Sequence, residues 1–381
     1  MAGLHVNRRA LIAGGASLAV LKPEAWGQDL TSLPMETNET GHFIVSVTIN
    51  GDPVRAILDN GSMAMMVDTS YAEEKGLTAS GKTPWGGGIR LEGTFKMKMG
   101  WLDANIEKPL LLDMSSILSE QGPVRLMIGR PLLDRLATVY SSAGKRFTIL
   151  PPDVKFEILG DHVTLPITLQ ADHHVVDASI ENGPPIKALV DLGCSNALVI
   201  RRSAATDRWI SEGRSWTTQA SYKMGDGRLV LSEDKLLTVR SISLGQFELK
   251  NLPAQLVAKD GGPFSDYDLT IGAPALARFT VTLDGPRMQL HLKPDNRVFT
   301  NPFEKTYVGI SSEEHPKGRR IVHIGANSPA MAAGLKAGDV VVAVNGRPPD
   351  KRVFRDAKAG DVLMVSVDTG AVRTVMAADF F

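Results

Sequence analysis

The sequence predicts a mainly β protein made of two homologous units, followed by a smaller α+β unit at the C-terminus. A segment that begins at residue 42 recurs without a gap from residue 174. In both copies, short apolar runs alternate with Gly, Pro and Asn turns, which is the pattern of antiparallel strands. After about residue 297 this repeat stops, and a strand–helix–strand pattern of a different kind begins.

The composition limits the class of protein. The chain has 381 residues, of which 43% are hydrophobic and 22% charged, as in globular proteins of two or three domains. The 42 basic residues balance the 42 acidic ones, which argues against a nucleic-acid-binding protein because such proteins carry a basic excess. Cys194 is the only cysteine, so an intramolecular disulfide and a cysteine-based zinc site are excluded.

The first residues read as a targeting segment. Arg8 and Arg9 precede the apolar stretch Ala10 to Leu21, and Ala25-Trp26-Gly27 offers a small-x-small cleavage site. The apolar stretch is too short to span a bilayer, and the paired arginines are typical of the twin-arginine export route. We therefore predict a signal peptide over residues 1–27 and a periplasmic or otherwise exported protein with no stable membrane span after signal removal. An uncleaved anchor is the alternative.

The repeated segment predicts one hairpin in each copy. Residues 42–67 align with residues 174–199, and Asn50-Gly51 aligns with Asn182-Gly183. An Asn-Gly pair between two apolar runs is a strong signal for a two-residue hairpin turn. Each copy should therefore fold as strand, tight turn and strand.

Each repeated hairpin ends in an Asp-x-Gly turn, which presents a carboxylate at the end of a strand. These carboxylates are Asp59 and Asp191. Further along each copy, two apolar residues precede a glycine, at Gly129 and Gly272, and a Pro-x-Leu segment follows that predicts a short helix and a second hairpin. The two units should occupy residues 35–155 and 156–297.

An apolar strand with Asp-x-Gly, followed by two apolar residues and Gly, resembles the retropepsin and pepsin fold. Two copies in one chain resemble a bacterial aspartyl protease family protein, a bilobal acid-protease-like double-β-barrel. The resemblance spans about residues 40–295 and implies that Asp59 and Asp191 form a catalytic dyad. Two carboxylates that share one proton supply both the general base and the general acid that peptide hydrolysis needs. The resemblance implies a protein or peptide substrate and no metal or organic cofactor.

The sequence departs from that family between Asp and Gly, where Thr or Ser is usual and locks the two loops together. Asn60 can still form hydrogen bonds there, whereas Leu192 cannot. Ser62 fits the pattern and is expected to bond the outer oxygen of Asp59. An active aspartic endopeptidase and a catalytically inactive peptide-binding protein of the cell envelope both stay open. The residues expected to support the dyad are Gly61, Ser62, Gly193, Cys194 and Ser195.

Three other features have two interpretations each. Gly86-Gly87-Gly88 is either a flap over the cleft or a flexible loop, and Met224-Gly225-Asp226-Gly227 favours a hairpin turn over a second flap. His173 and His174 favour a solvated strand start over a metal site, because the sequence offers no third ligand near them.

The last part of the chain carries a second specific pattern. Arg320–Ile324 predicts a strand, and Ser328-Pro329 predicts the start of a short helix with Ser as its N-cap and Pro in its first turn. Gly334 should end this helix. Val340–Val344 predicts a buried strand that stops at Asn345-Gly346. This order resembles a bacterial PDZ domain, which we place at residues 298–381.

PDZ domains bind an extended C-terminal peptide by strand addition. The resemblance implies that Tyr307-Val308-Gly309-Ile310 is the loop that holds the terminal carboxylate. The alternative is a packing or dimerisation module with a closed groove. The segment Pro348–Lys358, which should face the groove, is short and charged, so the sequence does not define the specificity pocket.

Overall fold

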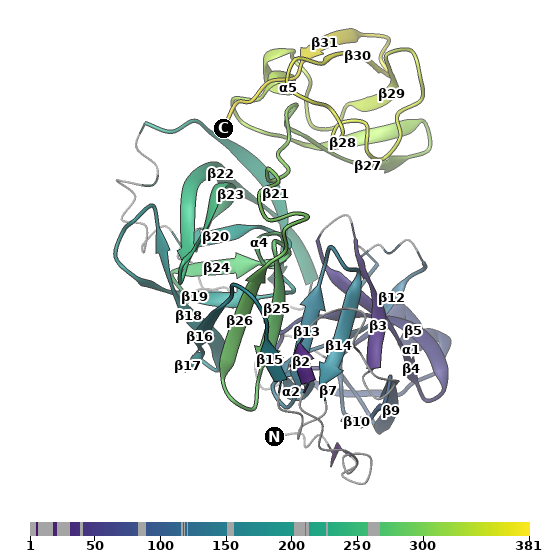
Figure 1. The fold of residues 1–381 in the computed structure, drawn as a ribbon. Helices are drawn as coiled ribbons and strands as arrows, with labels where there is room; N and C mark the ends of the chain where they lie inside the picture. Colours follow the sequence, from purple (N-terminus) through teal and green to yellow (C-terminus); the bar gives the residue numbers. More distant parts are fainter. Residues whose placement is uncertain are drawn as a thin grey trace.

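A computed structural model describes most of the 381-residue chain (Figure 1). The described residues are 5–6, 18–20, 31–38, 41–82, 89–115, 117, 119, 121–150, 156–201, 210, 213–225, 228–257 and 267–381. Most of the predicted signal peptide, all of Gly86-Gly87-Gly88, and Asp226-Gly227 lie outside them.

Three β-rich units follow one another along the chain (Figure 1). Lobe 1 comprises β3 (Thr31–Thr37), β4 (Phe43–Ile49), β5 (Asp52–Leu58), β6 (Met66–Asp68), α1 (Thr69–Glu74), β7 (Ala79–Lys82), β8 (Ile89–Leu91), β9 (Thr94–Met99), β10 (Leu102–Glu107), β11 (Leu110–Leu112), β12 (Val124–Ile128), α2 (Arg130–Leu133), β13 (Ala137–Ser141) and β14 (Arg146–Leu150). Lobe 2 comprises β16 (Val163–Pro166), β17 (Thr168–Gln170), β18 (His173–Ile180), β19 (Ile186–Asp191), β20 (Leu198–Arg201), β21 (Trp216–Gly225), β22 (Arg228–Leu244), β23 (Phe247–Val257), β24 (Leu269–Gly272), α4 (Ala273–Leu276), β25 (Phe279–Asp284) and β26 (Gln289–Pro294).

The C-terminal unit comprises β27 (Ile310–His315), β28 (Gly318–Ile324), α5 (Pro329–Ala332), β29 (Val340–Val344), β30 (Val362–Val367) and β31 (Val372–Met376). Two short N-terminal strands pair with the lobes: β1 (His5–Val6) with β10, and β2 (Leu18–Val20) with β15 (Phe156–Ile158). No helix within the described ranges is long and apolar enough to cross a membrane.

Both lobes build their carboxylate-bearing loop in the same way. In lobe 1, β5 pairs in parallel with β12, which is antiparallel to β6, and β6 is parallel to β11. In lobe 2, β19, β24, β20 and β23 repeat this order and these directions. The internal sequence repeat is therefore a repeat in topology, and it leads Asp59 and Asp191 to matching positions.

One sheet joins the two lobes. Its central strands are β13 and β25, which run antiparallel with Ala137 opposite Asp284 and Ser141 opposite Thr280. The hairpin partners β14 and β26 flank them, and β3 and β16 lie outside. A single buried apolar cluster continues from lobe 1 into lobe 2. The lobes are thus fixed to each other by backbone hydrogen bonds and by a shared core.

The two predicted hairpin turns differ. Asn50 and Gly51 have φ values of 52° and 91° and connect β4 to β5 with Ile49 opposite Asp52, as predicted. The prediction of a two-residue turn at Asn182-Gly183 is off by one residue. Glu181 and Asn182 have φ values of 49° and 59°, and Gly183 N donates to Ile180 O at 2.8 Å, although the paired strand β19 begins only at Ile186. Pro184 and Pro185 follow the glycine, and since proline has no N–H it cannot continue the ladder.

The C-terminal unit has its own core and the predicted element order. Its sheet runs β27-β28-β29-β30-β31, so β27 and β31 are edge strands. Ser328 caps α5 by accepting a hydrogen bond from Met331 N at 3.2 Å, and Gly334 has a φ of 79° just beyond the helix end. Val308, Ile321 and Val365 are among the residues of a separate apolar cluster. The segment around 351–356 forms turns and contains no helix.

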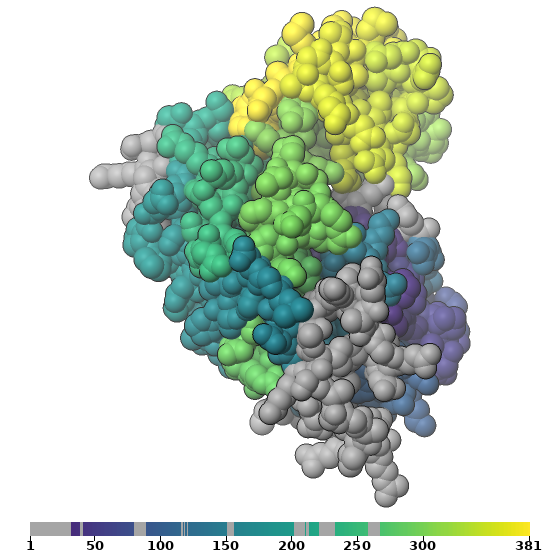
Figure 2. Space-filling model, in the orientation of Figure 1, coloured from purple at the N-terminus to yellow at the C-terminus, as the bar shows by residue number. Residues whose placement is uncertain are grey.

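The C-terminal unit docks on lobe 2 through the start of β21 (Figure 1, Figure 2). Thr217 Oγ1 donates to Ala326 O at 2.7 Å, and Ala326 N donates to Thr218 Oγ1 at 3.0 Å. His323 Nε2 lies 3.2 Å from both Thr218 Oγ1 and Glu233 Oε2. This polar contact, rather than a shared core, attaches the unit.

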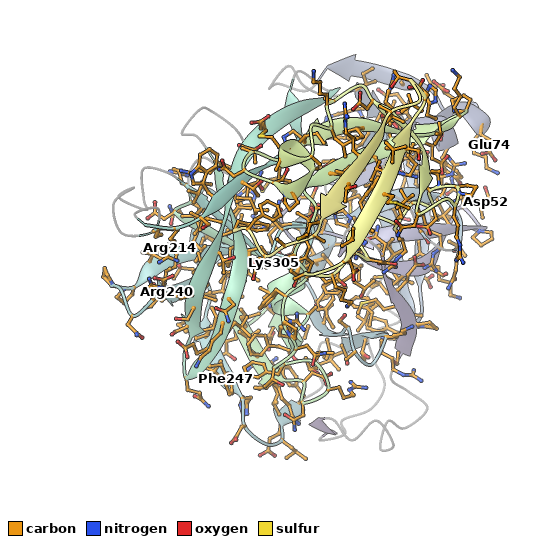
Figure 3. The ribbon with its side chains drawn as sticks, turned by 90° about the horizontal axis from the view of Figure 1, so that it is seen from above. Asp52, Glu74, Arg214, Arg240, Phe247 and Lys305 are labelled. Carbon is orange, nitrogen blue, oxygen red and sulfur yellow. The ribbon has the colours of Figure 1, made fainter. Side chains whose placement is uncertain are left out.

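The chain end adds a second attachment. Phe381 is buried, and its carbonyl oxygen accepts a hydrogen bond from Thr238 Oγ1 of β22 at 3.0 Å. Lys305 Nζ, labelled in Figure 3, pairs with Asp379 at 2.6 Å and lies 4.6 Å from the centre of the Phe381 ring. The linker before β27 and the chain end are therefore held together against lobe 2.

Replacing Thr217 by Val should weaken the docking of the C-terminal unit. Thr217 is 1% exposed, and valine has nearly the same shape but cannot donate to Ala326 O. A buried carbonyl that loses its donor costs about 1–3 kcal/mol. Hydrogen exchange of the amides of residues 323–327 should therefore be faster by roughly tenfold or more. Thr374→Val, at an exposed position of β31, is the matched control; equal exchange in both variants would contradict this description of the interface.

Candidate active site

The structure brings Asp59 and Asp191 together at the junction of the lobes. A side chain on Gly61 would place its β-carbon 2.6 Å from Cγ of Asp191, and one on Gly193 would lie 2.2 Å from Cγ of Asp59. Real β-carbons are not found so close to other atoms, so each position requires glycine. Each loop therefore packs its glycine against the carboxyl group of the other loop.

Backbone N–H groups hold both carboxylates. Gly61 N and Ser62 N donate to Asp59 Oδ1 at 2.9 and 3.0 Å, and Gly193 N donates to Asp191 Oδ1 at 2.8 Å. The expected bond from the Ser62 hydroxyl to the outer oxygen of Asp59 is replaced by one to Ala64 O at 2.9 Å. The side chain turns toward this carbonyl, so the Ser62 backbone N–H bonds the carboxylate instead.

Cys194 repeats the role of Ser62 in the second loop. Its Sγ lies 3.6 Å from Asn196 O, which matches the contact of Ser62 with Ala64. Burial is the main cause that raises the pKa of the Cys194 thiol, and the Asp191 charge adds to it. The thiol is therefore kept protonated. Ser195 is exposed, and no described hydrogen bond connects it to Asp191.

Asn60 ties the two loops together. Its side chain is fully buried, and its Nδ2 donates to Val190 O at 2.7 Å while its Oδ1 accepts from Leu192 N at 2.7 Å. One amide thus satisfies a buried donor and a buried acceptor of the opposite loop. Leu192 makes no such bond and lies in the apolar core, 1% exposed. Of the two residues between Asp and Gly, Asn60 alone therefore bonds the opposite loop.

The second glycine of each repeat, Gly129 or Gly272, packs against the backbone of the active-site loop in its own lobe. A β-carbon on Gly129 would lie 2.2 Å from Ala64 O, and one on Gly272 would lie 2.0 Å from Asn196 O. The neighbouring amides bond the same loops, because Arg130 N donates to Ser62 O and Ala273 N donates to Cys194 O, both at 2.9 Å. This close approach explains why glycine recurs there in both copies.

Two histidines brace the loops across the lobe interface. His173 Nε2 lies 3.0 Å from Gly61 O, and its Nδ1 lies 2.7 Å from the hydroxyl of Tyr267. In lobe 1, His42 hydrogen-bonds the backbone of Gly193, and burial lowers its pKa. Each active-site loop is therefore held by a histidine of the other lobe.

The interpretation of His173 and His174 as a solvated strand start is wrong. They are 8% and 1% exposed, and His174 Nε2 lies 3.2 Å from Asp134 Oδ1 of lobe 1. Burial lowers the pKa of His174, so it is neutral near pH 7. The identity of His42 and His174 in the repeat was the available signal, but strand position alone does not reveal a lobe interface.

Two family models match the chain. An aspartyl protease model matches residues 45–107 and a PDZ domain model matches residues 320–363. This chain contains an aspartyl protease domain and a C-terminal PDZ domain. The first match includes Asp59 but not Asp191, so the second half of the site is known from the internal repeat and the geometry.

Similarity to whole proteins is weaker. The chain is 22% identical over 184 residues to the serine protease Do-like HtrB of Bacillus subtilis (strain 168), covering 47% of this chain and 36% of the relative. It is 23% identical over 158 residues to the serine protease Do-like HtrA of the same organism, covering 39% and 33%. The chain thus spans about a third of the length of these curated relatives.

A search of solved structures finds the crystal structure of basic 7S globulin from soybean. The TM-score is 0.42 at 11% sequence identity, and the match covers 69% of this chain and 94% of that chain.

The two carboxyl groups of the protease domain titrate as an unequal pair. Burial raises the pKa of Asp59 to about 6. Burial also raises the pKa of Asp191 to about 8, and the nearby charge of Asp59 contributes to this rise. Asp191 is 2% exposed, whereas Asp59 is only partly buried. Near pH 7, the pair therefore holds one proton between its two carboxyl groups.

The predicted carboxylate loop of the PDZ domain is largely occupied by contacts within the chain. Gly309 has a φ of 76°, and its N–H donates to Thr306 Oγ1 at 2.9 Å. Val308 is fully buried, Tyr307 O accepts from Ala378 N at 2.9 Å, and Ile310 begins the edge strand β27. Among the described strands, β27 pairs only with β28 and so forms an edge of the sheet, whereas the Gly309 amide is already paired.

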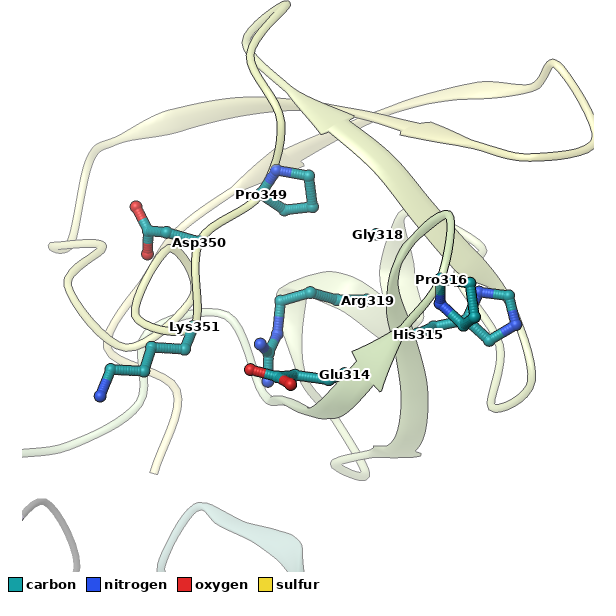
Figure 4. Close-up of a pocket in the computed structure, with 8 residues that line it drawn as sticks. All are labelled: Glu314, His315, Pro316, Gly318, Arg319, Pro349, Asp350 and Lys351. Atoms are coloured by element: carbon teal, nitrogen blue, oxygen red, sulfur yellow. The ribbon is translucent and has the colours of Figure 1, made fainter. Parts of the chain in front are cut away.

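A polar cavity of about 550 Å³ lies at the other end of β27 (Figure 4). Its walls are the turn from β27 to β28 and the segment that begins at Pro349. The charged side chains that line it are Glu314, Arg319, Asp350 and Lys351.

Replacing Asn60 by Leu should destabilise the protein. The change leaves Val190 O and Leu192 N buried without these partners, and such a loss costs about 1–3 kcal/mol per group. We expect a fall of at least this size in the free energy of unfolding, measured with urea. Leu192→Met, in the matching position of the other loop, should cost less than about 1.5 kcal/mol because its volume is conserved. Equal falls in the free energy of unfolding for Asn60→Leu and Leu192→Met would show that Asn60 acts by packing alone.

Replacing Asp191 by Asn should change how stability depends on pH. The folded-state pKa of Asp191 lies above its unfolded value of 3.8, so the native protein binds the extra proton. The contribution of this proton to the free energy of unfolding is complete below about pH 4 and is lost as the pH rises through 8. The amide of the variant does not ionise, so its stability relative to the wild type should rise from pH 4 to pH 8 by on the order of 2–5 kcal/mol. Denaturant unfolding at several pH values measures this.

Asp177→Asn is the control for this change, since Asp177 is an exposed residue of β18. It should show no comparable trend with pH. A parallel pH dependence of the wild type and Asp191→Asn would mean that Asp191 ionises normally.

Proposed function

We propose that this protein is an exported aspartic-type endopeptidase that hydrolyses peptide bonds with Asp59 and Asp191. The observation that carries the proposal is the mutual packing of the two loops, in which each glycine contacts the carboxyl group of the opposite aspartate. This arrangement places two carboxyl groups with unequal proton affinities at one point.

The unequal pair assigns the roles. Asp59, ionised and partly exposed, accepts a proton from a water molecule as that water attacks the peptide carbonyl carbon. Asp191, protonated and buried, donates its proton to the carbonyl oxygen. The tetrahedral intermediate then collapses: the nitrogen of the leaving group takes the proton from Asp59 as the C–N bond breaks. Asp191 takes back a proton from a hydroxyl group of the intermediate, so the dyad again holds one proton.

The serine proteases among the relatives raise the question of catalytic type. Ser62 and Ser195 are the serines of the two active-site loops. Ser62 Oγ donates to a backbone carbonyl, and neither serine has a histidine among its described hydrogen bonds. A serine nucleophile needs such a base. The site therefore favours the aspartic mechanism.

The PDZ domain would recruit protein or peptide tails to the protease lobes by adding a strand to β27. We propose a periplasmic location, reached by the twin-arginine route, because of Arg8, Arg9 and the apolar stretch that follows.

The second candidate is a pseudo-protease that binds peptides without cleaving them. Leu192 favours it, because this loop lacks the hydroxyl that the family uses to join the lobes. The paired N–H of Gly309 likewise favours a PDZ domain that serves as a packing module with a closed groove.

Digestion of a random peptide mixture, followed by mass spectrometry from pH 3 to pH 8, separates the candidates. Cleavage should be fastest between about pH 6 and pH 8, where one carboxyl group is ionised and the other protonated. Asp59→Asn and Asp191→Asn should each lower the rate by roughly 10³-fold or more. Asp177→Asn is the control. Binding of peptides without turnover, unchanged in either dyad variant, would support the pseudo-protease.

A further inference from the structure

A buried chain of hydrogen bonds runs from the second active-site loop into the sheet behind it. Asn196 Nδ2 donates to Gln255 Oε1 at 2.7 Å, and Gln255 Nε2 donates to Asp234 Oδ2 at 2.6 Å. Gln255 on β23 and Asp234 on β22 are each 3% exposed. Buried polar groups are costly unless they are paired, so a chain of this kind has to be oriented throughout.

The carboxylate sets the direction of this chain. Because the amide of Gln255 turns its NH₂ toward Asp234, its oxygen faces Asn196. The Asn196 amide then has to donate. The Asn196 side chain is thereby fixed in one orientation.

The first active-site loop has no such chain. Ala64 stands in the position that corresponds to Asn196 in the repeat, and its side chain has no polar atom. Asn60 holds the beginning of the lobe 2 loop at Val190 and Leu192. The end of that loop is held by Asn196 and, through it, by the sheet.

We propose that Asn196, Gln255 and Asp234 are positioning residues that hold the Asp191 loop in its catalytic geometry. This inference rests on the proposed function, since it names what keeps one aspartate of the dyad in place. None of the three residues needs to touch substrate. Their chain supports the loop in which Leu192 and Cys194 replace the family's hydroxyl residues.

The Asp234 end of this series of hydrogen bonds lies next to a contact with the PDZ domain. Glu233, next to Asp234, has its Oε2 3.2 Å from His323 Nε2, and β21, which pairs with β22, carries the docking residue Thr217. Strand β22, which carries Asp234, is therefore also held from the side of the PDZ domain. It is a firm support for the relay, as we call the hydrogen-bonded series Asn196, Gln255 and Asp234.

Gln255→Met tests the relay because methionine has a similar shape but no amide. We expect kcat on a peptide cleaved by the wild type to fall by roughly 10- to 100-fold, with KM within about twofold, because a small misplacement of a catalytic group has this effect. Gln246→Met is the matched control, an exposed glutamine at the turn of the same hairpin. Unchanged kcat in Gln255→Met would overturn the proposal.

A swapped pair tests the direction of the chain. Gln255→Glu alone faces Asp234 with a second carboxylate and should lose kcat. The double variant Gln255→Glu with Asp234→Asn rebuilds the chain, because the amide introduced at position 234 can donate to the carboxylate introduced at position 255, which still accepts from Asn196. We expect the kcat of the double variant to be at least tenfold higher than that of Gln255→Glu. A double variant no more active than Gln255→Glu, although folded by circular dichroism, would contradict the proposal.

Hydrogen exchange separates the relay from the proposed function. In Gln255→Met, the amides of Gly193 and Cys194 should exchange at least tenfold faster, while those of Gly61 and Ser62 stay unchanged. If the wild type cleaves no peptide, the proposed function fails, yet this exchange pattern still decides whether the relay positions the loop. Equal exchange in both loops would refute the relay whether or not the protein is active.

Discussion

The site depends on one buried side chain, the amide of Asn60. It donates to Val190 O and accepts from Leu192 N, and so it joins two loops in which each glycine also packs against the opposite carboxyl group. An amide can do this alone because it carries a donor and an acceptor side by side, whereas a hydroxyl on each loop would have to share the task. The unusual residue of loop 1 therefore makes an apolar residue in loop 2 acceptable.

The two halves of the site are alike in backbone and unlike in side chains. Both use a parallel strand pair, a glycine on the opposite carboxyl group and a second glycine below the loop. Asp191 is more deeply buried than Asp59, and its loop is held by Asn60 from one side and by Asn196 from the other. This inequality gives the two carboxyl groups different proton affinities, which a base and an acid need.

The features that could be predicted from the sequence are local or repeated. The Asp-x-Gly turns, the glycines at 129 and 272 and the capped helix at Ser328 could be predicted because each constrains its own few residues. The braces His42 and His173, the relay through Gln255 and the docking of Thr217 could not, since they join residues far apart in the chain. The second hairpin turn was predicted one residue too late, since Glu181 and Asn182 are its central residues.

The proposed mechanism requires that Asp59 and Asp191 share one proton at neutral pH. The most direct test is a carbon-13 NMR titration of the carboxyl groups in protein labelled at aspartate, with Asp59→Asn and Asp191→Asn used to assign the two signals. We predict that near pH 7 the Asp191 signal is that of a carboxylic acid and the Asp59 signal that of a carboxylate. Two carboxylate signals already present at pH 5 would mean that the groups do not interact, and the account would be wrong.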